Sequence, residues 1–251
     1  MSVITPVVPA VRIVIPWRPA PSRLDAFDRV VAWYQQNLPG VPILTVDTGD
    51  DPFVLAACRN AAMRDAQVDE VVIISDADTI PEREPLLAAI RAAATSDLVH
   101  LPYDEYRWLG RTGSADYAAG VPLERCAVEQ FVDGACSGIY VATPRTWAAH
   151  GGQDEGFRGW GFEDAAWYLA HTTLLGAPPR RHRGRVFALH HVGESRAGTA
   201  YDANEARMAR YRDAAHDPER MAALVFGYED LDAAMIAELD GGSGAVPDAV
   251  S

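Results

Sequence analysis

The stretch Val71-Val72-Ile73-Ile74-Ser75-Asp76-Ala77-Asp78-Thr79 decides the fold that this sequence predicts. Its four apolar, β-branched residues are typical of a short buried strand in a parallel sheet. The strand leads into two carboxylates one residue apart, where open α/β sheets bind their ligands. Two hard oxygen donors there suit a divalent cation that also contacts phosphate. Without the rest of the chain, a structural role explains the two acids equally well: Asp76 would cap a turn and Asp78 would cap the next helix.

Strands and helices alternate around this stretch. Apolar runs predict strands at 11–15, 41–46 and 98–101, and helical spacing predicts helices at 24–38 and 82–94. Ser22 and Asp25 resemble a capping box, and Asp51-Pro52 resembles an N-cap with proline at the first helical position. This order predicts an α/β fold with a mostly parallel central sheet flanked by helices.

The second half of the chain has a less regular pattern. Residues 102–130 are expected to form a long loop, either a lid or acceptor loop or a disordered surface loop. A strand ending at 142 and a helix at 144–150 follow. Amphipathic helices are expected at 204–212 and 217–239, and 241–251 is expected to be disordered.

Two further groups of reactive side chains stand in this half. A Gly159-Trp160-Gly161 turn brings Glu163 and Asp164 to the start of a helix expected at 165–172, where acids also suit the helix dipole. A strand at 185–189 ends in His190 and His191. Period-two alternation places the two imidazoles on opposite faces, so at most one can reach a shared metal. Either one alone is more often an ordinary polar contact.

Composition limits the classes of function. The chain has 251 residues and a formal net charge of −13, which disfavours broad binding to nucleic-acid backbone. No apolar run is long enough to span a bilayer, and residues 1–10 do not resemble a signal peptide. Three cysteines at no metal-binding spacing indicate reduced thiols, and we expect a cytoplasmic protein.

Taken together, these residues resemble the GT-A glycosyltransferases over about residues 11–196. The nucleotide-binding half of the family 2 type is similar to Ile15-Pro16-Trp17-Arg18, Asp47, Arg59-Asn60-Ala61 and Ser75-Asp76-Ala77-Asp78. The acceptor half of β-1,4-galactosyltransferases and polypeptide N-acetylgalactosaminyltransferases is similar to the region from Ser137-Gly138 to Trp160-Gly161-Phe162-Glu163-Asp164. Phe162 stands where a glycine is common in the galactosyltransferases, so the donor sugar is left open.

The resemblance implies a role for each of these residues. Asp47 would read the uracil edge, and Arg18 and Arg59 would contact the nucleoside or the diphosphate. Asp76 would lie by the ribose and the metal, and Asp78 would ligate Mn²⁺ or Mg²⁺ directly. His191, with His190 as the alternative, would complete the coordination. The other donor contacts implied are Pro16, Asn60, Ala77, Gly138, Trp160 and Gly161.

The resemblance also implies the catalytic pair and the domain plan. Asp164 would be the general base of an inverting reaction, and Glu163 would hold hydroxyl groups of donor or acceptor. One domain would span 1–200, with a nucleotide half at about 11–101 and an acceptor half at about 131–196. Helices at 201–240 and the tail at 241–251 would follow.

The predicted function is therefore metal-dependent transfer of a sugar from a UDP-sugar to an acceptor hydroxyl. A nucleotide-sugar-binding module without catalysis is one alternative. A nucleotidyltransferase is another, although Pro16-Trp17-Arg18-Pro19 lacks the glycine-rich loop that would hold a triphosphate. The sequence does not distinguish a glycan, protein, lipid-linked or nucleic-acid base acceptor.

Overall fold

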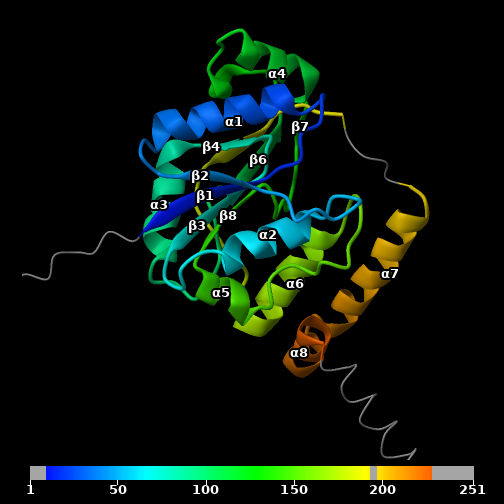
Figure 1. The fold of residues 1–251 in the computed structure, drawn as a ribbon. Coiled ribbons are helices and arrows are strands. Elements are labelled where there is room, and N and C mark those ends of the chain that lie inside the picture. Colours follow the sequence, from blue (N-terminus) through cyan, green and yellow to red (C-terminus); the bar gives the residue numbers. More distant parts are fainter. Residues whose placement is uncertain (1–9, 193–196, 228–251) are drawn as a thin grey trace, which may run out of the picture.

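The computed structural model describes residues 10–192 and 197–227. Within them, the larger sheet has the strand order β2-β1-β3-β8-β5-β9 (Figure 1). Its strands are β1 (Val11–Pro16), β2 (Ile43–Val46), β3 (Val71–Ser75), β5 (His100–Leu101), β8 (Ile139–Ala142) and β9 (Arg180–Arg181). Only β8 runs against the others, so the sheet is mostly parallel, as predicted.

Helices cover this sheet. They are α1 (Leu24–Asn37), α2 (Leu55–Arg64), α3 (Arg83–Ala93) and α5 (Pro144–Ala149). The helix α2 contacts β1, β2 and β3, whereas α3 contacts β3, β5 and β8. All residues of β3 and β8 are buried as a result, which explains why β3 reads as an unbroken apolar run.

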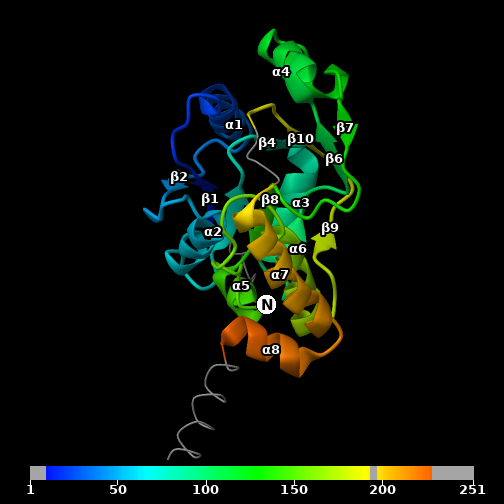
Figure 2. The ribbon, with the colours of Figure 1, turned by 90° about the vertical axis from the view of Figure 1, so that its right-hand side faces the viewer.

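A smaller sheet with the order β4-β10-β6-β7 stands beside the first (Figure 2). It contains β4 (Thr79–Pro81), β6 (Glu105–Trp108), β7 (Gln130–Phe131) and β10 (Arg185–Ala188). The helix α4 (Gly110–Ala118) and a short 3₁₀ turn (Leu123–Arg125) lie between β6 and β7. The prediction of a long loop at 102–130 is therefore wrong, because pairing with β10 organises this segment.

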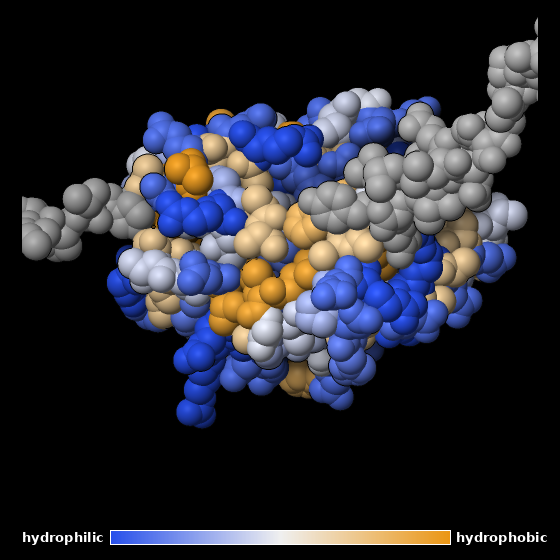
Figure 3. All heavy atoms as spheres, turned by 90° about the horizontal axis from the view of Figure 1, so that it is seen from below, coloured by the Kyte–Doolittle hydropathy of each residue, from blue (hydrophilic) through white to orange (hydrophobic). Residues whose placement is uncertain are grey.

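Three helices pack together at the other end of the chain: α6 (Glu163–Leu175), α7 (Thr199–Ala214) and α8 (Pro218–Phe226). They bury a separate apolar cluster that includes Phe157, Met208, Tyr211 and Met221. Figure 3 shows the molecule from below, where apolar residues gather at the centre of a largely hydrophilic face.

Several predicted helix ends differ from the structure. The N-cap of α1 is Arg23 without a side-chain cap, so the predicted capping box does not form. The helix α2 begins at Leu55 rather than at Pro52. The helix α6 begins two residues earlier than predicted, which places Glu163 and Asp164 in its first turn. The predicted tail at 241–251, residues 193–196 and the part of the last predicted helix beyond 227 lie outside the described residues.

Within the described ranges, no helix combines the length and hydrophobicity needed to cross a bilayer.

Candidate active site

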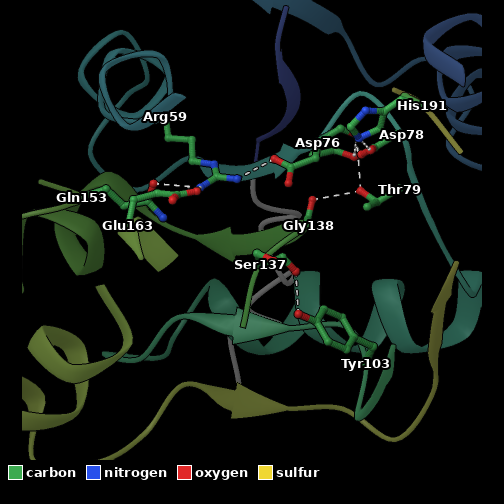
Figure 4. Close-up of polar contacts among 11 residues, drawn as sticks. Arg59, Asp76, Asp78, Thr79, Tyr103, Ser137, Gly138, Gln153, Glu163 and His191 are labelled. Atoms are coloured by element: carbon green, nitrogen blue, oxygen red, sulfur yellow. Dashed lines mark hydrogen bonds and ion pairs between the residues drawn. The ribbon is translucent and has the colours of Figure 1, made fainter. Parts of the chain in front are cut away.

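A cleft of about 520 Å³ opens at the carboxyl ends of β1 and β3. Residues from seven separate parts of the chain line it, and Figure 4 shows polar contacts among several of them. The lining includes these predicted site residues: Pro16, Arg18, Arg59, Asp76, Ala77, Asp78, Trp160, Gly161, Glu163, Asp164 and His191. Most of the side chains that the sequence singled out therefore meet in one place.

The Asp76–Asp78 turn is held by Gly138, which directly precedes the neighbouring strand β8. The Asp76 amide and the Thr79 hydroxyl both donate to the Gly138 carbonyl, at 2.7 and 3.0 Å. Gly138 has φ +91, and a Cβ there would lie 3.1 Å from Thr79 Cγ2. Gly138 is absent from the lining of the cleft. Gly138 thus supports the turn. The resemblance instead implies that it contacts the donor.

Asp78 and His191 face each other inside the cleft. His191 Nε2 lies 2.8 Å from Asp78 Oδ2, and the hydrogen bond to this carboxylate raises the pKa of His191. The antiparallel pairing of β10 with β4 continues through the Leu189 amide, which donates to the Asp78 carbonyl at 2.8 Å. This pairing brings His191 to the Asp76–Asp78 turn.

His190 takes a different position. Its amide donates to Ser114 Oγ on α4 at 2.7 Å, and it is not part of the cleft lining. The two imidazoles thus lie in different surroundings, as predicted, although β10 ends at Ala188 before both of them. His191 is the one that lies beside the two aspartates.

The donor atoms of Asp78 and His191 fit one divalent cation. A carboxylate oxygen and an imidazole nitrogen already converge, and both line an open cleft. Asp76 Oδ1 is instead engaged by Arg59 at 2.7 Å. Among the described residues no group of three His, Cys, Asp or Glu side chains could hold a metal. Phosphate and water would therefore have to supply the remaining ligands, as they often do for hard cations.

Arg59 is a buried cation beneath the cleft. It is 1% exposed, and its guanidinium donates to Asp76 Oδ1 and to Gln153 Oε1, at 2.7 and 2.9 Å. The same group lies 3.8 Å from Glu163 Oε1 and above the Tyr140 ring. Arg59 therefore ties the Asp76–Asp78 turn to α6. This position is deeper than the contact with the nucleoside or the diphosphate that the resemblance implies.

Glu163 and Asp164 occupy different environments. Burial, with Asp164 second, raises the pKa of Glu163 to about 7, although Arg59 opposes this shift. Asp164 Oδ1 accepts a hydrogen bond from the Ala165 amide at 2.8 Å. Among the described residues no hydrogen bond or ion pair engages Asp164 Oδ2, and Asp164 lines the cleft.

The Trp160 turn is held from α7, which the sequence did not indicate. Asn204 is 2% exposed, accepts from the Arg158 amide at 3.1 Å, and donates to the Arg158 carbonyl at 2.8 Å. Tyr201 stacks against Trp160, with ring centroids 6.2 Å apart, and also contacts Phe162. A helical asparagine and tyrosine carry no spacing signal for such contacts, because their partners are about 45 residues away along the chain.

Two predicted donor contacts lie away from the lining. Both carboxylate oxygens of Asp47 accept from Arg18, at 2.6 and 2.7 Å, so Asp47 stands behind the arginine that lines the cleft. The Asn60 amide donates to the Gln153 carbonyl at 2.8 Å and accepts from Trp147 Nε1 at 2.9 Å. Asn60 thus fastens the 147–155 segment to α2 and does not line the donor cleft.

No protein-family model and no curated protein matches this chain, whereas several solved structures do. The catalytic domain of Drosophila β1,4-galactosyltransferase 7 in complex with xylobiose has a TM-score of 0.52 at 15% identity, over 79% of this chain and 80% of that one. A mutant of that enzyme in complex with manganese, UDP-Gal and xylobiose has a TM-score of 0.53 at 13% identity, over 78% and 79%. GalNAc-T7 with UDP, GalNAc and Mn²⁺ has a TM-score of 0.50 at 12% identity, over 87% of this chain and 52% of that one. The chain therefore has the GT-A glycosyltransferase fold.

Proposed function

We propose that this chain is a metal-dependent glycosyltransferase that moves a sugar from a UDP-sugar to an acceptor hydroxyl with inversion. One observation carries the proposal: the Asp78–His191 pair and the Glu163–Asp164 pair face a single cleft at the carboxyl ends of the strands. One pair offers metal ligands, and the other offers a proton acceptor. Structures of the same fold contain manganese and UDP-Gal, or UDP and Mn²⁺, which supports this choice of donor and metal.

The donor set favours manganese over magnesium. Magnesium is bound almost wholly by oxygen, whereas imidazole nitrogen suits the transition metals. Asp78 and His191 would hold the cation. When bound, a divalent cation stabilises the charge of a departing nucleoside diphosphate.

The side chains of this protein would do the remaining work. Arg18, above the Phe53 ring at the mouth of the cleft, would contact the nucleoside, with Asp47 fixing its direction. Trp160 and Gly161 would cover the donor sugar. Asp164 Oδ2 would take the proton from the acceptor hydroxyl, because Glu163 is turned toward Arg59. Arg59 would keep Asp76 and Glu163 in place from below.

Titration calorimetry of UDP, with and without Mn²⁺, tests the metal and the nucleotide together. We expect manganese to strengthen UDP binding to the natural protein. Asp78→Asn should lower the affinity for UDP in the presence of Mn²⁺ by at least about tenfold, because it weakens a direct ligand of the metal. Asp69→Asn is the matched control, since Asp69 is exposed at the opposite end of β3. Metal-independent UDP binding, or none at all, would contradict the proposal.

A panel of UDP-sugars tests catalysis. We expect slow, manganese-dependent release of UDP from at least one α-linked donor, and a β-linked product by NMR once an acceptor is found. Metal-enhanced UDP binding without turnover of any donor would favour a binding module instead. An α-linked product would contradict the inverting mechanism.

A further inference from the structure

A second cleft of about 700 Å³ lies beside the candidate active site. It is walled by Tyr106, Phe131 and Tyr168, and by Asp104, Asp133 and Arg181. Its volume is within the range of small-molecule binding sites. We call it the lateral cleft.

The lateral cleft adjoins the first one. Tyr106 lines both of them. Tyr168 lies four residues after Asp164 on α6, so the two side chains share one face of that helix. The 134–137 segment forms the wall between the clefts, and the Tyr103 hydroxyl anchors it by donating to the Ser137 carbonyl at 2.5 Å (Figure 4). A molecule that extends from the lateral cleft past Tyr106 would therefore approach Asp164.

The walls of the lateral cleft combine rings with carboxylates. Phe131 is 59% exposed, which is unusual for so large an apolar side chain and leaves its ring open to a ligand. Aromatic faces stack on the C–H faces of sugar rings, and carboxylates accept hydrogen bonds from hydroxyl and ammonium groups. These two kinds of wall suit a polyhydroxylated ring.

The charges decide which sugar fits best. The single guanidinium of the cleft, Arg181, is already engaged by the Ala135 carbonyl and lies above the Tyr103 ring. Asp133 is exposed and has no hydrogen bond or ion pair within the described part of the chain. Asp104 uses only Oδ1, which accepts from the Gly184 amide at 2.9 Å. With Glu105, the lining carries three carboxylates against the one guanidinium of Arg181. The charge of the cleft is thus negative and favours a cation.

We propose that the lateral cleft binds the acceptor, and that the acceptor is a sugar bearing a free amino group. Only the role of the bound sugar as the acceptor rests on the proposed function; its binding to the cleft does not. The ammonium group would lie against Asp133 and Asp104, the ring would stack on Phe131 or Tyr106, and a hydroxyl would reach Asp164.

Binding can be measured without any turnover. Three probes share one ring and differ in charge: methyl β-glucosaminide, methyl β-glucoside and methyl β-glucuronide. We expect NMR titration slightly below neutral pH to show the highest affinity for the cationic probe, a lower affinity for the neutral one and the lowest for the anionic one. Successive affinities should differ by roughly fivefold to tenfold, which is the contribution of one partly exposed charged hydrogen bond. Asp133→Asn should remove most of the preference for the amine, and Asp69→Asn should not.

Equal affinities for the three probes, or a preference for the glucuronide, would overturn the proposal. So would an amine preference that survives Asp133→Asn and Asp104→Asn together. If the natural protein does not bind UDP, the proposed function is wrong. The order of affinities for the three probes then still tests what the lateral cleft binds. If donor turnover is found, the glucosaminide should accelerate UDP release more than the glucoside, and Asp133→Asn should reduce that difference between the two sugars.

Discussion

Mild acid should destabilise this protein through three buried histidines. His100, His150 and His171 are 4%, 0% and 0% exposed. Burial is the main cause that lowers their pKa values, to about 4, 3 and 4 respectively. His150 packs against Trp147 and Trp167, and neither of its ring nitrogens has a hydrogen-bond partner among the described residues. The folded state therefore holds these imidazoles neutral.

The direction and size of the effect follow from proton linkage. An unfolded histidine titrates at about pH 6.5, so below that pH the unfolded chain binds more protons and the folded state loses stability. At about pH 5 each of the three histidines costs about 2 kcal/mol, or about 6 together. Glu163 opposes this loss: its pKa is raised to about 7, so its protonation on going from about pH 7 to about pH 5 returns about 2 kcal/mol. A net loss of about 4 kcal/mol is a large part of the stability of an ordinary domain.

Thermal unfolding followed by circular dichroism at several pH values measures this loss. His150→Leu keeps a similar volume and removes one titrating group, so about 2 kcal/mol of the acid sensitivity should disappear, or roughly 4–8 °C in the Tm shift. At neutral pH the variant should be at least as stable as the natural protein, because two unpaired buried nitrogens are gone. His216→Leu, at an exposed position, is the control. Equal Tm shifts for His150→Leu and the natural protein would refute the reasoning.

Three further outcomes can be checked. Asp164→Asn keeps the shape of the side chain but cannot accept a proton, so turnover should fall by about 10²–10⁴-fold with unchanged UDP affinity by calorimetry; an active variant would exclude it as the base. His191→Ala should weaken manganese-dependent UDP binding, whereas His190→Ala should not, because only His191 lies in the cleft; the reverse result would mean that the histidines exchange places. Gly138→Ala should cost about 1–3 kcal/mol in chemical unfolding, since alanine is strained at a positive φ and its Cβ would crowd Thr79; unchanged stability would show that the turn adapts.

The sequence alone predicted the parts of the fold that depend on local pattern. The apolar run of β3, followed at once by Asp76 and Asp78, indicated a buried strand with a ligand edge, and both the strand and the position of the acids at the cleft agree with the structure. The alternation of strands and helices likewise gave a mostly parallel sheet. Such features are readable because periodicity and strand ends are properties of a few neighbouring residues.

Pairing between distant segments decided the rest. The strand β8 lies antiparallel between β3 and β5, and β6 and β7 are too short to be stable without β10, which is why 102–130 looked like a loop. The resemblance implied that Arg59 contacts the donor, but no local pattern indicated its burial. Asp76, Gln153 and Glu163 reach Arg59 from other segments and make that burial possible. Burying a charge is favourable only when its partners are in place, and the partners of Arg59 come together only through the tertiary fold.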